Sequence, residues 1–349
     1  MTLLEFGSIS RRLSAAVFAA LTLFGHRLFA QSADLAPGAN DIPVLQVSAS
    51  LVVVDAVVTD GHTHRPIRGL TPDDFVLKEE GREQTILHSD PGRTPLSIVF
   101  MIDLTRTVRS VRQSLGEAAQ EILSRLEKND EVAVAVFSSS AKIVLPFTAD
   151  RATAQLALMQ ASQMSSNEPT FLNEAVYQVT SQFMRSATVG NRKTIICLTD
   201  GTADVPSDRV KQTEAPSMAK VPLHTEKDAE TAVLQTAATV NAVIEKSAMT
   251  YFIEASRHPR AEEVRQYPPG DVKAYAKLSG GIVVSSSKAN GSEALFDLLD
   301  ELKSRYTLSY RPSEPAATGS FRHIDLKTAP EATSRIGPAS VQARQGYYR

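Results

Sequence analysis

Between Pro95 and Lys303 the sequence alternates between short apolar runs and amphipathic stretches, and this alternation limits the possible fold more than any other feature. Alternating strands and helices imply right-handed crossovers and a mostly parallel sheet that helices cover on both faces. The pattern predicts strands at Leu96–Ile102, Glu131–Phe137, Lys142–Phe147, Thr194–Leu198, Met249–Ala255 and Gly281–Ser285. It predicts helices at Thr107–Leu126, Arg151–Gln163, Leu172–Arg185, Lys227–Lys246, Asp271–Leu278 and Ser292–Leu302. The sequence therefore predicts an open α/β domain over residues 95–303.

The first of these helices shows how the apolar face is recognised. Within Val108–Leu126, apolar residues recur at steps of three and four, which places them along one side of a helix. Charged residues, Arg112 among them, take the other side. We therefore expect Arg112 to face solvent.

Both flanks of this domain have the composition of β-structure. Residues 44–59 are rich in valine, and the segment "DDFVLKEEGREQTILHS" predicts two short strands joined at Glu80-Gly81. After Lys303 the segments "SRYTLSYRPS", "SFRHIDLKT" and "SVQARQGYYR" have the same character. We predict that residues 44–94 and 304–349 pair into one small β-sandwich, into which the α/β domain is inserted.

The first thirty residues have the pattern of an export signal. Arg11 and Arg12 precede the apolar stretch Leu13–Gly25, and Ala30 offers a small residue at a cleavage point. Residues 1–30 are therefore predicted to be a signal peptide, followed by a linker over residues 31–43. Export through the general or the twin-arginine route stays open. We expect a secreted or periplasmic protein of the cell envelope with no membrane span after the signal is removed.

Composition excludes other classes of protein. The net charge is −2, which gives no reason to expect a nucleic-acid partner. The single cysteine rules out a disulfide framework within the chain and a cysteine metal cluster.

Five side chains with oxygen donors are placed at the ends of predicted strands or in loops. They are Asp103, Thr105, Thr107, Thr170 and Asp200. The carboxyl ends of parallel strands meet at one edge of an open sheet, so these distant residues are expected to lie close together. Carboxylates and hydroxyls suit a hard cation, so the set predicts a site for Mg²⁺, or for Mn²⁺ or Ca²⁺ in its place. Taken singly, Thr105 and Thr107 could instead cap the helix that begins there, and Asp200-Gly201 could be an ordinary turn from strand to loop.

The motifs "IVFMIDLTRT", "DEVAVAVFSSSAKIVLPFT", "PTFLNEAV" and "IICLTDGTAD" resemble those of the von Willebrand factor type A domain, which has a Rossmann-like fold. The flanking β segments are similar to those of secreted bacterial proteins of the related subfamily. The family's metal-dependent adhesion site (MIDAS) has the form Asp-x-Ser-x-Ser, then a distant Thr, then Asp-Gly. By position, the resemblance assigns it to Asp103, Thr105, Thr107, Thr170 and Asp200 with Gly201.

The resemblance implies a binding role. In the family, the two hydroxyls bind the ion directly, the other ligands bind directly or through water, and a carboxylate from a protein partner completes the coordination. This sequence departs from the pattern with threonine for both serines, Arg106 for a common glycine, and Glu168-Pro169 for a pair of glycines. Glu168 and Asp204 are candidates for filling the partner's position from within the molecule.

The expected function is therefore recognition of a protein or peptide with an acidic residue, without catalysis. Two alternatives stay open: a metal-free scaffold in an envelope assembly and a metal-dependent hydrolase. The second is disfavoured because Thr105 stands where a phosphatase with an Asp nucleophile would carry a second Asp. A glycine-rich phosphate loop with its lysine is also missing from the sequence.

Overall fold

The computed structural model describes residues 51–63, 65–92, 94–201, 203, 224–245, 270–286, 290–314 and 317–349. The chain divides into two compact units, Met1–Ser48 and Ala49–Arg349, and every described residue belongs to the second. The predicted signal peptide, the linker and the predicted strand Met249–Ala255 lie outside the described residues. In the described part of the chain, no helix is both long enough and apolar enough to cross a bilayer.

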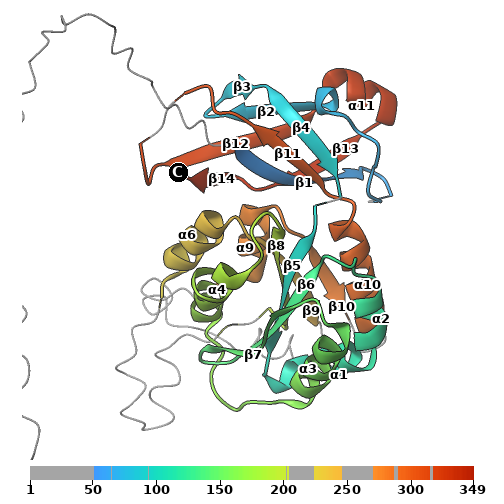
Figure 1. Ribbon diagram of the computed structural model, residues 1–349, viewed down its shortest axis with the longest axis vertical. Coiled ribbons are helices and arrows are strands. Elements are labelled where there is room, and N and C mark those ends of the chain that lie inside the picture. The colour runs from blue at the N-terminus through green and yellow to red at the C-terminus, as the bar shows by residue number, and fades with distance from the viewer. Residues whose placement is uncertain are drawn as a thin grey trace, which may run out of the picture. The chain divides into compact units, whose positions relative to one another are not determined.

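A six-stranded sheet in the order β10-β9-β8-β5-β6-β7 forms the base of the α/β part (Figure 1). Neighbouring strands run parallel, except that β7 is antiparallel to β6. The strands are β5 (Leu96–Asp103), β6 (Glu131–Phe137), β7 (Ala141–Thr148), β8 (Arg192–Thr199), β9 (Thr239–Glu245) and β10 (Val283–Ser286). The chain adds strands outward from β5 in one direction and from β8 in the other. The β5–β8 pair is thus a switch point, where open α/β sheets bind ligands at the carboxyl ends of their strands.

Helices bury both faces of this sheet because successive residues of β5 point to opposite sides. Ile98 and Phe100 belong to the core cluster with α1, α2, α3 and α10. Val99 and Met101 belong to the cluster with α4, α6 and α9. The helices are α1 (Arg109–Glu117), α2 (Ala119–Ser124), α3 (Arg151–Gln163), α4 (Leu172–Ser181), α6 (Glu226–Thr236), α9 (Val272–Ser279) and α10 (Gly291–Leu302). The 3-10 turns are η1 (Pro72–Asp74), η2 (Arg106–Val108) and η3 (Phe183–Ser186).

Two further sheets draw their strands from both ends of the described chain. Their orders are β13-β1-β11-β4 and β14-β12-β2-β3, and they share one apolar core (Figure 1). The strands from the N-terminal side are β1 (Val52–Asp60), β2 (Phe75–Glu79), β3 (Arg82–Gln84) and β4 (Ile86–Pro91). Those from the C-terminal side are β11 (Tyr306–Tyr310), β12 (Phe321–Thr328), β13 (Ala339–Ala343) and β14 (Gly346–Tyr348). The predicted fold class, a Rossmann-like domain with β-structure built from both flanks, is confirmed.

The predicted hairpin in the N-terminal flank is also present. β2 pairs antiparallel with β3, and the turn between them holds Glu80 at φ 49° and Gly81 at φ 79°. Two consecutive residues at positive φ match the twist of a tight hairpin, and glycine adopts such an angle at no steric cost.

One predicted helix is wrong. Helix Lys227–Lys246 ends at Thr236, and Ala237 at φ 55° turns the chain out of it. Thr239–Glu245 is strand β9, which is fully buried beside β8. The stretch has no glycine or proline to signal a break, and its apolar residues fit either element by spacing. The strand is favoured because it buries the β-branched residues of this stretch in the sheet.

Other differences are smaller. The predicted helix Thr107–Leu126 is divided by η2 and by a break at Ala118, where ψ is 3°. Helix α11 (Pro330–Ile336) between β12 and β13 was not predicted. Its proline at the first helical position is typical of a helix start, but the segment is only seven residues long.

Candidate metal site

The two aspartates of the predicted site follow neighbouring strands. Asp103 is the last residue of β5, and Asp200 comes directly after β8. β5 and β8 pair in parallel with Ile102 opposite Leu198, so both carboxylates lie at the same edge of the sheet. Both residues are buried, Asp103 completely and Asp200 to 3% exposure. The structure thus brings the aspartates together at the switch point.

Hydrogen bonds join four of the five predicted residues into one network. The backbone N–H of Thr105 donates to Oδ1 of Asp103 at 2.9 Å, and the hydroxyls of Thr105 and Thr107 lie 3.1 Å apart. The Thr107 hydroxyl donates to Oδ2 of Asp200. The Thr105 side chain makes no capping hydrogen bond to η2. The N-cap position of α1 is taken by Val108, and not by either threonine. The hydroxyls therefore point into the cluster and not into the helix start.

Thr170 approaches the same edge from the loop before α4. It is 2% exposed, and its loop is tied down on two sides. Phe171 N–H donates to the Ser138 carbonyl at 2.9 Å, and Ser166 N–H donates to the Leu104 carbonyl at 3.0 Å. The second bond joins the Thr170 loop to the residue that follows Asp103. Direct binding of a cation by Thr170 stays a prediction.

Thr199 links the two aspartate loops, although sequence reasoning did not single it out. Its hydroxyl donates to Oδ2 of Asp103 at 3.1 Å and accepts from the Gly201 N–H at 3.1 Å. Gly201 is at φ 75°, a conformation that glycine adopts readily. One hydroxyl thereby orients the first carboxylate and fixes the turn that carries the second.

Replacing Thr199 with valine is expected to lower the free energy of unfolding by about 1–2 kcal/mol. Valine keeps the shape but leaves the Gly201 N–H and one Asp103 oxygen without this partner. Chemical denaturation with chelator measures the loss. Thr180→Val is the matched control, because that buried hydroxyl bonds only carbonyls of its own helix. Equal losses in the two variants would contradict a specific role for Thr199.

Arg112 was predicted to face solvent, and this prediction is wrong. The residue is 3% exposed, and its Nη1 donates to the carbonyls of Asp103 and Thr105, both at 3.0 Å. Its Nε donates to the Ser162 carbonyl at 3.3 Å. Arg112 comes four residues after Val108 and three before Leu115, so helical spacing itself places it on the buried side of α1, and its charge alone had favoured the solvent side. Arg112 thus holds the backbone of the loop that carries the first carboxylate and both hydroxyls.

Glu245, the last residue of β9, is a third buried carboxylate at this edge. It accepts hydrogen bonds from the Val111 N–H at 3.1 Å and from the Ser110 hydroxyl, in the first turn of α1. Burial raises the pKa of Glu245, and the charge of Asp200 adds to the rise. Sequence reasoning missed it because β9 was predicted to be helical. It positions the start of α1, where a negative charge is favourable.

The electrostatics of the site suit a cation. Burial raises the pKa of Asp103 to about 7, and the charge of Asp200 contributes in the same direction. A divalent ion between the two carboxylates would offset both costs. Within the described residues, no three His, Cys, Asp or Glu side chains gather as a metal-binding group. An ion would therefore depend on two carboxylates with hydroxyls and water, a donor set that suits Mg²⁺.

The pKa of Asp103 predicts how the stability of the metal-free protein depends on pH. The value rises from 3.8 to about 7 on folding, so between these limits the folded state binds the extra proton. The contribution of Asp103 to the free energy of unfolding therefore falls as pH rises from about 4 to 7, by about 1.4 kcal/mol per unit of pKa difference, and is constant above that range. Denaturation of wild type and Asp103→Asn in chelator from pH 5 to 8 measures it. The stability of the wild type relative to the variant should decrease over this range, and a constant difference would contradict the assignment.

The residues that depart from the family pattern lie around the site. Arg106 is exposed. Oε2 of Glu168 accepts from the Ser138 and Ser139 hydroxyls at 3.0 and 2.7 Å, and its role as an internal ligand stays a prediction. These bonds lower the pKa of Glu168. Asp204, the other candidate, lies outside the described residues.

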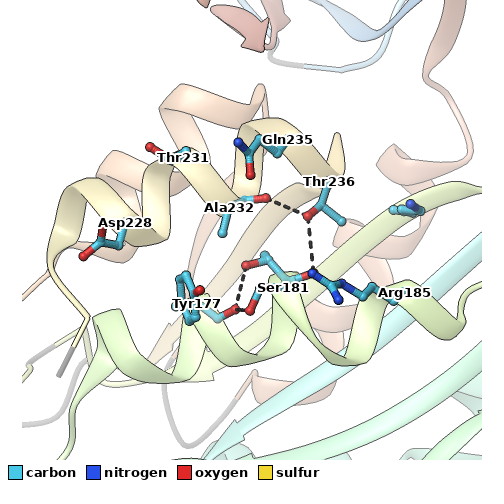
Figure 2. A pocket seen from close by; sticks show the side chains of 10 residues that line it. Tyr177, Ser181, Arg185, Asp228, Thr231, Ala232, Gln235 and Thr236 are labelled. Atoms are coloured by element: carbon cyan, nitrogen blue, oxygen red, sulfur yellow. Dashed lines mark hydrogen bonds between the residues drawn. The ribbon is translucent and has the colours of Figure 1, made fainter. Parts of the chain in front are cut away.

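A cavity of about 490 Å³ between α4 and α6 contains none of the predicted site residues (Figure 2). Its hydroxyls are used locally: Ser181 donates to the Tyr177 carbonyl and Thr236 to the Ala232 carbonyl. The cavity is thus a polar groove between two helices, separate from the carboxylate edge.

Comparison with known proteins gives a family for the α/β part. Residues 98–202 match the model of the von Willebrand factor type A domain family. This range contains all five predicted site residues. No curated protein shows significant similarity to the chain.

Solved structures with similar arrangements are distant. BatB, a conserved hypothetical protein from Bacteroides thetaiotaomicron, is 16% identical, with a TM-score of 0.39 over 59% of this chain and 97% of that one. An aerotolerance-related membrane protein from Bacteroides fragilis is 16% identical, with a TM-score of 0.38 over 59% and 98%. Proximal thread matrix protein 1 from the mussel byssus, with a zinc-occupied MIDAS motif, is 12% identical, with a TM-score of 0.39 over 65% and 50%. At these scores the similarities do not bear on the chemistry of the site.

Proposed function

Because the chain contains a von Willebrand factor type A domain, we propose that it binds a protein or peptide ligand through a divalent cation held by Asp103, Thr105, Thr107, Thr170 and Asp200. Mg²⁺ is the proposed ion, with Mn²⁺ or Ca²⁺ as substitutes. The observation that carries the proposal is the hydrogen-bonded chain from Asp103 through the two threonines to Asp200.

The donor set indicates which group of a partner protein would bind the proposed ion. In the proposed site, two carboxylates balance the charge of a divalent ion, and hydroxyls and water supply neutral oxygens. A carboxylate from a partner would replace one of these waters, because carboxylate oxygens are among the preferred ligands of such a hard cation. The Thr107 hydroxyl donates a hydrogen bond to Asp200, which leaves its oxygen lone pairs for the ion.

We also propose that the protein is exported and is not an enzyme. Export rests on the first thirty residues, and membership of the secreted bacterial subfamily rests on the flanking β segments. The proposal of binding without catalysis rests on what the other charged groups at the site do. Arg112 binds the backbone carbonyl of Asp103, and Glu245 accepts from the backbone N–H of Val111 at the start of α1, so both have structural roles. Hydrolysis of a generic phosphoester that chelator abolishes would contradict this part.

Capture of partners from envelope extract tests the proposed function. Immobilised wild type with Mg²⁺ is expected to retain proteins that chelator releases, and Asp103→Asn should retain none of them. A variant at the exposed Asp297, Asp297→Asn, is the matched control and should behave as wild type. Retention that is equal with and without chelator would favour a metal-free scaffold.

A further inference from the structure

A second cavity, of about 260 Å³, is lined by side chains of both the β-sandwich and the α/β part. Its polar lining includes Asp55, Thr307 and Arg344 from the sandwich sheet and Arg192 and Lys193 from β8. Lys193 is half-buried. The cavity is partly open to solvent, so a small molecule can enter it.

Two arginines, Arg192 and Arg344, line this cavity, and the charge of Arg192 acts on a third, Arg305. Arg192 and Arg305 are 5% and 2% exposed. Arg192 Nη2 donates to the Leu302 carbonyl at 3.0 Å, and Arg305 Nη1 donates to the Gly280 carbonyl at 2.7 Å. Arg344 donates to the Val53 carbonyl. These hydrogen bonds use only some of the N–H groups of each guanidinium.

The remaining donors have no partner among the described residues. They are Nη1 of Arg192, Nε and Nη2 of Arg305, and Nε of Arg344, and all of them are buried. Leaving a buried donor unpaired is unfavourable, most of all when the group is charged. The two guanidinium groups that line the cavity, those of Arg192 and Arg344, thus each have an unpaired donor, which points to an acceptor that is not part of the chain.

Acidic groups within the cluster do not replace that acceptor. Asp55 and Glu301 are the carboxylates whose charges act on Arg305, and Asp55 also acts on Arg344. Asp55 accepts the Thr307 hydroxyl at 2.8 Å. Within the described part of the chain, neither carboxylate forms an ion pair with these arginines, so the cations outnumber the acids that face them.

We propose that this cavity binds a small oxyanion, a phosphate or a carboxylate group, through Arg192, Lys193 and Arg344. Guanidinium groups present paired donors that match two oxygens of such a group, and the ammonium of Lys193 adds a point charge. The volume exceeds that of the oxyanion itself and admits a small organic molecule that carries it.

Calorimetric titration of inorganic phosphate and of succinate into metal-free protein tests the proposal and separates the two sources of the oxyanion. At least one of them should bind wild type saturably. The dissociation constant should rise about tenfold in Lys193→Gln and in Arg344→Gln. The side chain of Lys193 makes no hydrogen bond to another described residue, so replacing it with glutamine should leave the fold intact. Lys128→Gln, at an exposed turn, is the matched control and should bind as wild type.

Binding of neither anion, or equal binding by wild type and both variants, would overturn the proposal. Circular dichroism of each variant shows that it is folded before titration. Removing the metal with chelator keeps the result independent of the cation site. The chelator is dialysed away before titration, because its own carboxylates could occupy a site built from arginines.

Discussion

Replacing Glu79 with alanine is expected to lower the free energy of unfolding by about 3–5 kcal/mol. Glu79 is 1% exposed in the core of the sandwich. Its Oε1 accepts from Nε and Nη2 of Arg322 at 2.9 and 2.6 Å. Its Oε2 accepts from the Tyr347 hydroxyl at 3.1 Å and from the Tyr310 hydroxyl. Alanine leaves the largely buried guanidinium and both phenols without their acceptor.

Urea denaturation at constant pH measures this loss. Glu79→Gln keeps an acceptor oxygen and should lose less than the alanine variant, because it removes the charge but not the whole side chain. Glu83→Ala, at an exposed position of β3, is the matched control and should change stability by less than about 0.5 kcal/mol. A loss below about 1 kcal/mol for Glu79→Ala would contradict the role of this network.

The second large effect is expected at the metal site. Asp103→Asn should weaken Mg²⁺ binding by at least about 100-fold, because substitution even of groups outside the ligand shell costs 10–100-fold. The same change should stabilise the metal-free protein at pH 8, where the wild type holds a buried charge and the pKa of Asp103 is about 7. A variant that loses metal while gaining stability cannot owe the loss to unfolding.

Calorimetry with Mg²⁺ and denaturation with chelator measure the two parts of this prediction. Asp297→Asn again serves as the control and should change neither. Unchanged metal affinity in Asp103→Asn would remove Asp103 from the site. A less stable Asp103→Asn at pH 8 would show that the carboxylate is needed in its charged form without metal.

Much of the carboxylate edge was predictable because apolar strands end abruptly there. The run Leu96–Ile102 stops at Asp103, and the predicted strand Thr194–Leu198 stops just before Asp200. The parallel pairing of β5 and β8 therefore brings the two aspartates to one edge of the sheet. The pairing of β1 with β11 and β13 was likewise implied by β segments at both flanks that lacked partners of their own.

The supporting residues were not predictable, and the reasons are physical. Arg112 was placed on the solvent face because charged side chains are usually exposed, although its spacing from Val108 and Leu115 puts it on the buried side. The distant backbone carbonyls that accept its hydrogen bonds cannot be read from the sequence. Glu245 was missed because the stretch Thr239–Glu245 fits helical spacing as well as strand spacing. In both places the outcome depends on tertiary packing and not on local preference.

The most direct test of the metal site is an anomalous diffraction experiment on crystals grown with Mn²⁺. A single peak is expected at the carboxyl ends of β5 and β8. It should lie within about 2.0–2.6 Å of the Thr105 and Thr107 hydroxyl oxygens, with Asp103 and Asp200 in direct or water-mediated contact. A crystal grown in saturating Mn²⁺ that shows no peak there, or a peak only at another place on the protein, would contradict the proposed metal site.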